Sequence, residues 1–239
     1  MSIAARILAN TQNRQYPLPE KNWKYYQEWH KTIFFHWEVP VYFLEEYIPD
    51  GLELDLYQNM AWVSVVSFEV KNRTLRNMPA FPYLSNFEEI NVRTYVTKNG
   101  IRGIYMFSIE TNKLIEVLLS KLFAGLPYQK SEIKRSGDEL RSSNKKLEHI
   151  LDITIGAHAP ILHKTALDLW LTERYALYEV CGTKLCRFDI HHAEWNLSNL
   201  DVTIRDICYD AGKYTINIYP DTIQYSEKIE VLFWDKIEV

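Results

Sequence analysis

Residues 87–96 read FEEINVRTYV, and the alternation in this stretch decides how the rest of the chain is interpreted. In an extended strand, successive side chains fall on opposite faces of the sheet. The stretch therefore predicts a strand with one mainly aliphatic face and one face on which three polar groups lie between aromatic rings. The first face carries Ile90, Val92, Thr94 and Val96, and the second carries Phe87, Glu89, Asn91, Arg93 and Tyr95.

The polar face of this strand has two possible environments. On the outside of a sheet it would be an ordinary solvent-exposed polar face, because half-buried strands routinely alternate in this way. Turned inward, it would form a recognition surface, since apolar walls with a few convergent polar groups are typical of small-molecule sites. The pattern slightly favours the inward arrangement, with Glu89, Asn91 and Arg93 as ligand-binding candidates.

The segments next to this strand also have strand character. Residues 61–68, AWVSVVSF, are almost continuously apolar and β-branched, which predicts a strand covered on both faces. Lys98-Asn99-Gly100 is a strong hairpin signal that leads into a further strand over residues 102–109.

The remainder of the chain reads as strands with a few short helices. Apolar spacing and capping residues predict helices over residues 3–8, 41–47, 112–123 and 166–175. Further strands are predicted over residues 128–135, 147–155, 176–190 and 229–233, the first of them turning at residues 136–138. No linker or internal repeat marks a boundary. We therefore predict one β-rich α+β domain spanning residues 1–239.

Composition and charge exclude several classes of protein. The chain has 239 residues, of which 47% are hydrophobic, so a substantial core is available. A formal net charge of −4 argues against a nucleic-acid-binding surface. No apolar run reaches the ~18 residues that a membrane-spanning helix needs, and Arg6 interrupts any signal-peptide core. A cytoplasmic location without membrane association is the default expectation.

Cysteine and histidine spacing gives no metal site. Cys181, Cys186 and Cys208 are too few for a disulfide framework, and no second pair of ligands accompanies them. His158 and His163 are separated by five positions and by Pro160, so the helical zinc spacing is absent. We expect neither a metal nor a cofactor. Structural histidines are commoner than catalytic ones, yet His36, between Phe35 and Trp37, remains a candidate for proton transfer, as does the pair His191-His192.

Several stretches together resemble the YqjF-like bacterial family of uncharacterised proteins. They read FHWEVP at 35–40, PDGLELD at 49–55, AWVSVV at 61–66, FEEINVRTYV at 87–96, GLPY at 125–128 and LTERYALY at 171–178. That family in turn resembles acetoacetate decarboxylase in fold. The resemblance implies a mostly antiparallel, barrel-like sheet around a cavity, with a few outer helices. It does not confer the reaction.

The decarboxylase chemistry requires lysines that this chain lacks at the matching positions. The decarboxylase loop carries two adjacent lysines after a proline, and the first forms a Schiff base with the substrate. After Pro127, the present chain has Tyr128-Gln129, and neither side chain can form an imine. Lys130 would serve only if the register moved by two residues. The cavity glutamate of the decarboxylase has a counterpart in Glu89, whereas its arginine near the chain start falls at His36-Trp37-Glu38 and has none.

Two functions from different classes remain after this comparison. The preferred one is a protein that binds a small, anionic organic molecule in a barrel cavity formed by Glu89, Asn91, Arg93, Trp37 and Tyr128. The alternative is an enzyme that acts on small organic acids or ketones by acid–base chemistry through Glu89 or His36, without an imine. In either case we expect Arg93 to neutralise Glu89 or to bind the ligand, because an unpaired buried carboxylate is costly. The sequence does not fix the ligand or the oligomeric state.

Overall fold

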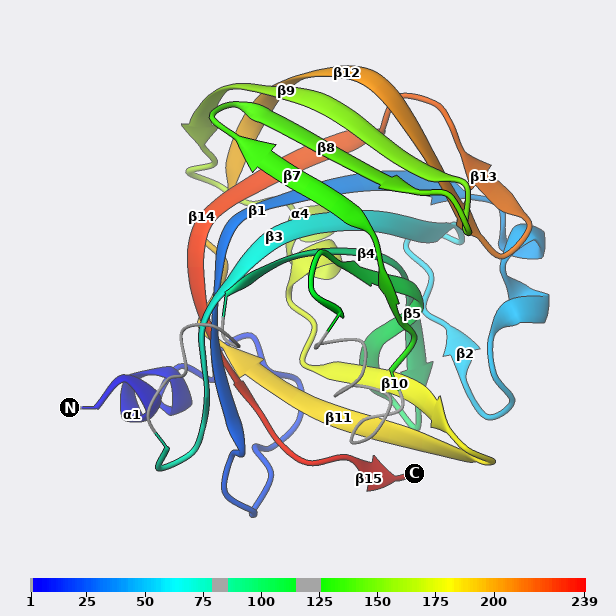
Figure 1. Ribbon diagram of the computed structural model, residues 1–239. Helices are drawn as coiled ribbons and strands as arrows, with labels where there is room; N and C mark the ends of the chain where they lie inside the picture. Colours follow the sequence, from blue (N-terminus) through cyan, green and yellow to red (C-terminus); the bar gives the residue numbers. More distant parts are fainter. Residues whose placement is uncertain (1, 79–85, 115–125) are drawn as a thin grey trace.

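Seven strands form a closed ring in the computed structural model, which describes residues 2–78, 86–114 and 126–239 (Figure 1). Neighbouring strands of the ring are antiparallel, except that β5 and β10 pair in parallel with Leu177 opposite Ile104. Pairing of β11 with β14 closes the ring. In order around it, the strands are β1 (Tyr25–Val39), β3 (Ala61–Leu75), β4 (Phe87–Lys98), β5 (Ile101–Thr111), β10 (Ala176–Cys181), β11 (Lys184–His192) and β14 (Thr222–Phe233).

Four further strands extend the same sheet beyond β14 and fold back over the ring (Figure 1). They are, in order, β12 (Ser198–Ala211), β9 (His149–Pro160), β8 (Glu139–Asn144) and β7 (Glu132–Ser136). Four short strands pair at the margins: β2 (Glu53–Leu54), β6 (Tyr128–Lys130), β13 (Tyr214–Ile216) and β15 (Ile237–Glu238). We call β7, β8, β9 and β12 the outer sheet.

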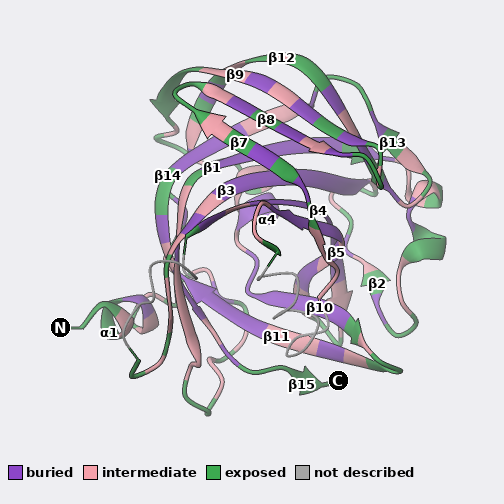
Figure 2. Cartoon of the chain, in the orientation of Figure 1, coloured by how far each residue is buried: buried purple, intermediate pink, exposed green. Residues whose placement is uncertain are grey.

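The two largest hydrophobic cores among the described residues follow from this arrangement. One fills part of the ring and includes Phe34, Phe68 and Tyr95. The other lies between the outside of the ring and the outer sheet, and includes Phe35, Val65 and Leu151. Strands β1, β3 and β4 are therefore buried on both faces, as Figure 2 shows for the middle of the molecule. This confirms the expectation that residues 61–68 form a strand covered on both sides.

The helices within the described residues are short. They are α1 (Ile3–Leu8), α4 (Ala166–Thr172) and the 3₁₀ turns η1 (Val41–Phe43) and η2 (Glu45–Tyr47). In α4, Thr165 and Asp168 form a reciprocal capping box, which explains where the helix begins. Its Trp170 packs on Tyr95 inside the ring, with ring centroids 4.6 Å apart. No helix in the described parts of the chain is long and apolar enough to cross a membrane.

The structure corrects three local predictions. Residues 41–47 form two 3₁₀ turns instead of one helix, and the helix expected over 166–175 ends at Thr172. The strand that returns from the Gly137 turn is β8, so residues 147–155 belong to a third strand, β9. Most of the helix predicted over residues 112–123 lies outside the described residues.

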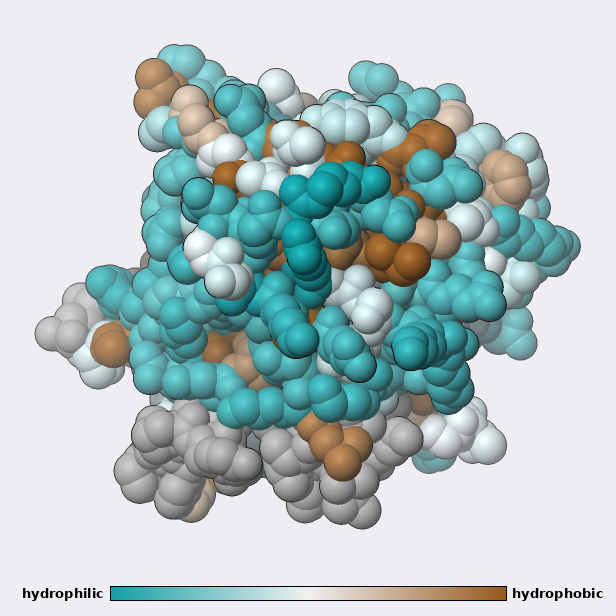
Figure 3. Space-filling model, turned by 45° about the horizontal axis from the view of Figure 1, so that its top comes forward, coloured by the Kyte–Doolittle hydropathy of each residue, from teal (hydrophilic) through white to brown (hydrophobic). Residues whose placement is uncertain are grey.

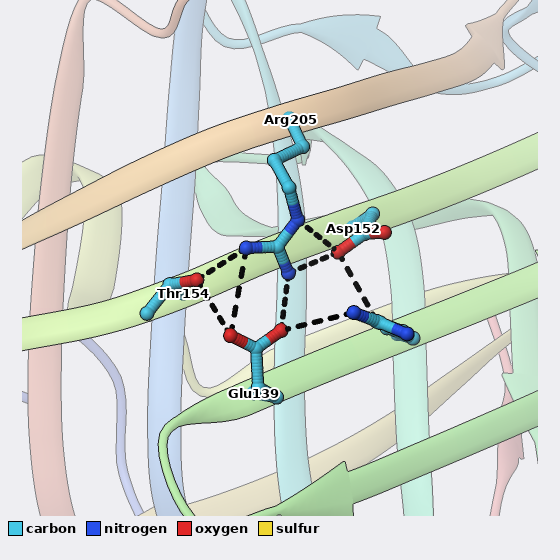
Figure 4. A network of polar contacts seen from close by, with 5 residues as sticks. Glu139, Asp152, Thr154 and Arg205 are labelled. Atoms are coloured by element: carbon cyan, nitrogen blue, oxygen red, sulfur yellow. Dashed lines mark hydrogen bonds and ion pairs between the residues drawn. The ribbon is translucent and has the colours of Figure 1, made fainter.

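The exposed face of the outer sheet is mainly hydrophilic (Figure 3). On it, Arg205 of β12 donates from Nε to Asp152 of β9 at 2.8 Å and also contacts Glu139 of β8 (Figure 4). Hydrogen bonds from Thr154 and then Arg205 lower the pKa of Glu139. The hydrogen bond from Arg205 lowers the pKa of Asp152. The network links three neighbouring strands across a solvated surface, where individual ion pairs contribute little to stability.

Candidate ligand-binding cavity

A cavity of about 590 Å³ lies inside the ring, next to the core that fills the rest of it. Its size is within the range usual for small-molecule sites. One wall is aromatic and is formed by Trp29, Phe34, Phe68, Trp195 and Phe233. The opposite wall is aliphatic and includes Ile104, Ile109 and Leu177. Both walls come from residues that point into the ring from its strands, apart from Trp195, which follows β11.

The polar face of β4 forms part of the cavity wall. Glu89, Asn91 and Arg93 are only 6%, 2% and 7% exposed, and all three line the cavity. The alternate residues Ile90 and Val92 lie in the core under the outer sheet. Both faces of β4 are covered. Its apolar face lies in the core under the outer sheet, and its face with three polar groups lies at the cavity inside the ring.

Glu89 is held by two hydrogen bonds from neighbouring side chains. The Tyr128 hydroxyl donates to Oε2 at 2.7 Å, and Asn91 Nδ2 donates to Oε1 at 3.4 Å. Tyr128 reaches the cavity because β6 pairs in parallel with β5, which places it opposite Ile109. The structure thus brings together four of the predicted ligand-binding residues: Glu89, Asn91, Arg93 and Tyr128.

Arg93 is a buried cation without a carboxylate partner among the residues that the structure describes. Its Nη2 donates to the Leu171 carbonyl at 3.5 Å, and its guanidinium lies 5.7 and 5.9 Å from the ring centroids of Phe34 and Tyr95. Its Nε has no hydrogen-bond partner among the described residues. Of the two roles expected of Arg93, the ion pair with Glu89 is not formed, and contact with a ligand stays a prediction. Since breaking or omitting a buried charge pair costs several kcal/mol, an anion in the cavity would complement Arg93.

Three more buried polar atoms at the cavity lack a hydrogen-bond partner within the described part of the chain, namely Thr32 Oγ1, Asn91 Oδ1 and Trp195 Nε1. Such atoms are uncommon in native interiors, and a ligand is one explanation for them. Sequence reasoning missed Thr32 and Trp195. Thr32 shares a face with Trp29 only because the pairing of β1 shifts between His30 and Ile33, where Lys31 has φ +49°; the sequence carries no plain signal for this bulge.

Trp37 and His36 do not occupy the positions expected for site residues. Trp37 lies on the opposite face of β1, in the core under the outer sheet, and its Nε1 donates to the Ile218 carbonyl at 3.1 Å. His36 points into the ring but is completely buried behind Phe34, on which it stacks. Adjacent residues of a strand cannot share a face, so the two could not both have reached one cavity.

The His36 imidazole takes part in a small buried hydrogen-bond cluster. Its Nδ1 lies 2.6 Å from Ser64 Oγ, which lies 2.6 Å from the Tyr95 hydroxyl. Burial, and secondly the charge of Arg93, lower the pKa of His36 to about 3. Burial likewise lowers the pKa of His192 to about 4. Both rings are therefore neutral near pH 7, and His36 is poorly matched to acid–base catalysis there.

These buried histidines predict that the protein loses stability in mild acid. In the unfolded chain the pKa of each histidine is near 6.5. Below that pH the unfolded state therefore binds protons at these positions, whereas the native state does not. We expect the free energy of unfolding to fall by about 2 kcal/mol per histidine between about pH 7 and pH 5. Urea unfolding across this range measures the slope. His36→Gln should reduce it, whereas replacing the exposed His158 in the same way should not; equal slopes in all three proteins would contradict the assignment.

Lys130 does not supply the missing Schiff-base lysine. Its side chain is exposed, and its Nζ donates to the Ser131 carbonyl at 3.0 Å. The register shift that would have brought it inward is not present, because Tyr128 occupies that position. Within residues 2–78, 86–114 and 126–239, no group of three or more His, Cys, Asp or Glu side chains is placed to hold a metal ion.

Comparisons with known proteins agree with this architecture. A family model described as an uncharacterized conserved protein matches residues 26–230. The uncharacterized protein YqjF of Bacillus subtilis (strain 168) is 36% identical over 231 residues, which are 93% of this chain and 96% of that protein.

Two solved structures share the fold at low sequence identity. Acetoacetate decarboxylase from Legionella pneumophila superposes with a TM-score of 0.62 at 12% identity, over 95% of this chain and 93% of that one. The enduracididine biosynthesis enzyme MppR, complexed with pyruvate, gives 0.61 at 11% identity, over 94% and 93%. The predicted fold class, β-rich α+β with a barrel-like sheet, is thereby confirmed.

Proposed function

This chain belongs to DUF2071, a family of uncharacterized conserved proteins, and from that starting point we propose that it binds an anionic organic molecule in the cavity of its barrel. The observation that carries the proposal is Arg93: a buried guanidinium that faces the cavity and has no carboxylate partner in the described part of the chain. A planar guanidinium is suited to bidentate capture of a carboxylate.

The surroundings of Arg93 support an organic anion over an inorganic one. The aromatic wall offers apolar contact for a carbon body, and the polar groups converge from one strand. The lining of the cavity also includes the cations Lys24, Arg73 and Lys236, and its carboxylates among the described residues are Glu89 and Asp235, the latter paired with Lys24. An excess of positive charge at a cavity attracts anions and raises their rate of association.

Substitution of Arg93 tests the proposal. A thermal-shift screen of carboxylic acids first identifies a binder, since any ligand of the native state raises apparent stability. Measured by calorimetry, Arg93→Lys should then reduce the binding free energy of that acid by roughly 1–3 kcal/mol. Lysine keeps the positive charge but cannot donate the two parallel hydrogen bonds of a guanidinium. Arg93→Met should weaken it further. Arg141→Lys, on the exposed outer sheet, is the control and should bind like wild type. Equal affinity in all four proteins would refute the role of Arg93.

A second candidate function is supported by the hydrogen bond between Glu89 and Tyr128. A carboxylate and a phenol 2.7 Å apart in a cavity are placed to accept and donate protons. On this alternative, the protein is an enzyme that acts on small organic acids or ketones by acid–base chemistry. The reaction would not pass through an imine, since the matching loop has Tyr128-Gln129 where lysines would be required.

The absence of an imine can be tested directly. We expect that incubation with acetoacetate and borohydride leaves the intact mass of the protein unchanged, because the exposed Lys130 lies beside Ser131 and outside the cavity. Acetoacetate decarboxylase treated in parallel serves as the positive control. An adduct that maps to Lys130 would contradict our interpretation of the loop.

A further inference from the structure

The chemistry of the cavity beside Arg93 narrows the class of ligand. Resting on the proposed function, we propose that the ligand is a carboxylic acid with an apolar ring as its body and an O–H or N–H donor next to its carboxylate. In this arrangement Arg93 binds the carboxylate and Asn91 Oδ1 accepts the hydrogen bond of the donor. A hydrophobic 2-hydroxy acid has this combination of groups.

The orientation of the Asn91 amide supports the role of an acceptor. The amide edge that faces Glu89 is Nδ2, which donates to Glu89 Oε1 at 3.4 Å. Oδ1 is therefore the remaining edge of the amide, and it has no partner although Asn91 is 2% exposed. A buried carbonyl oxygen without a donor is costly, and a ligand O–H or N–H would satisfy it.

The spacing along β4 sets the distance between the two ligand groups. Asn91 and Arg93 are two residues apart on one face, which is about 6.6 Å along a strand. The unpaired donor Arg93 Nε and the unpaired acceptor Asn91 Oδ1 therefore come from neighbouring positions on the cavity side of β4. For this reason we place the donor of the ligand within one or two carbon atoms of its carboxylate.

The volume of the cavity indicates a ligand that has, besides its carboxylate and donor, a sizeable apolar part. At ~30 Å³ per water molecule in the liquid, 590 Å³ corresponds to about twenty waters. A three- or four-carbon acid would leave most of this space unfilled. The Trp195 ring packs against both Trp29 and Phe34, and the three rings offer an aromatic surface on which a ring can pack.

Two matched acids test this inference by calorimetry. We expect 3-phenyllactate to bind wild type roughly tenfold more tightly than 3-phenylpropanoate, which lacks only the hydroxyl. The preference should vanish in Asn91→Leu, which has similar volume and no acceptor. Thr32→Val removes another unpaired oxygen of the same cavity and so tests the competing acceptor; the preference should persist in it. Arg141→Lys, on the exposed outer sheet, is the control and should bind both acids like wild type. Arg93→Met should weaken both acids.

A ligand-side measurement keeps the test valid if Asn91→Leu does not fold. The O-methyl ether of 3-phenyllactate cannot donate, so it should bind wild type no better than 3-phenylpropanoate. Equal affinity of the hydroxy acid and 3-phenylpropanoate, with both dependent on Arg93, would overturn the inference and leave the proposed function standing. A preference lost in Thr32→Val instead of Asn91→Leu would overturn the assignment to Asn91. Binding of neither acid, while other carboxylates bind, would overturn the ligand class.

Discussion

Asp55→Ala is expected to lower the free energy of unfolding by about 3–5 kcal/mol, the cost of leaving a buried charge without its partner. Asp55 follows β2 and accepts a hydrogen bond from Arg174 Nη1 at 2.5 Å. Arg174 is almost completely buried, and burial lowers its pKa to about 10 although Asp55 opposes that shift. Without Asp55, its charge would remain between the rings of Tyr95 and Trp170, 4.8 and 4.3 Å from their centroids.

A second arginine provides the control for this prediction. Arg102 also pairs with Asp55, at 3.0 Å, but its side chain is 37% exposed, so water can replace the contact. Arg102→Met should therefore cost less than about 1 kcal/mol, as is usual for solvated ion pairs. Denaturant unfolding of both variants provides the comparison. If Asp55→Ala cost no more than Arg102→Met, the buried pair would not be the source of stability.

Gly103→Val is expected to destabilise the protein by about 3 kcal/mol or to prevent folding, because the ring has no room for a side chain there. A Cβ atom on Gly103 would lie 2.6 Å from the Ala176 carbonyl oxygen and 2.8 Å from Tyr178 Cε2. The obstructing oxygen belongs to the backbone of β10, next to the parallel pair with β5. The clash can be relieved only by moving these two strands apart.

Gly137→Asn is the matched control for Gly103. Gly137 has φ +58°, but a Cβ atom added there would meet no other atom of the described chain within 4 Å. Asparagine also tolerates this backbone conformation better than most residues. Thermal unfolding should show a small loss for Gly137→Asn and a large one for Gly103→Val. Similar losses in the two variants would mean that the close approach of β10 does not decide the cost at Gly103.

The alternation in β4 was sufficient to predict the polar side of the cavity wall. Glu89, Asn91 and Arg93 fall on one face of any regular strand, whatever the rest of the fold. The same rule, applied across His36-Trp37, shows why Trp37 was wrongly expected at the cavity. The hairpin signal at Asn99 and Gly100 also predicted the partner strand β5, and their positive φ values of 50° and 77° suit a tight turn.

The features that were missed depend on contacts distant in sequence. Thr32 reaches the cavity through a bulge at Lys31, and a bulge is set by pairing with neighbouring strands. Trp195 comes from the segment between β11 and β12 and packs against Trp29, which lies far earlier in the chain. The sequence left two roles open for Arg93, a pair with Glu89 or a contact with the ligand, because spacing along a strand does not determine how far a long side chain reaches.

The pairing of β1 with β14 has a consequence for biosynthesis. Tyr25 of β1 lies opposite Phe233 of β14. Strand β1 therefore cannot pair with β14 until nearly the whole chain has been synthesised. At roughly 5–20 residues per second, the ribosome needs about 10–40 s to cover that distance. During this interval one edge of an aromatic-rich strand is open to other nascent chains, and the ring cannot close. From this topology we expect slow folding, because the ring closes only through contacts distant in sequence.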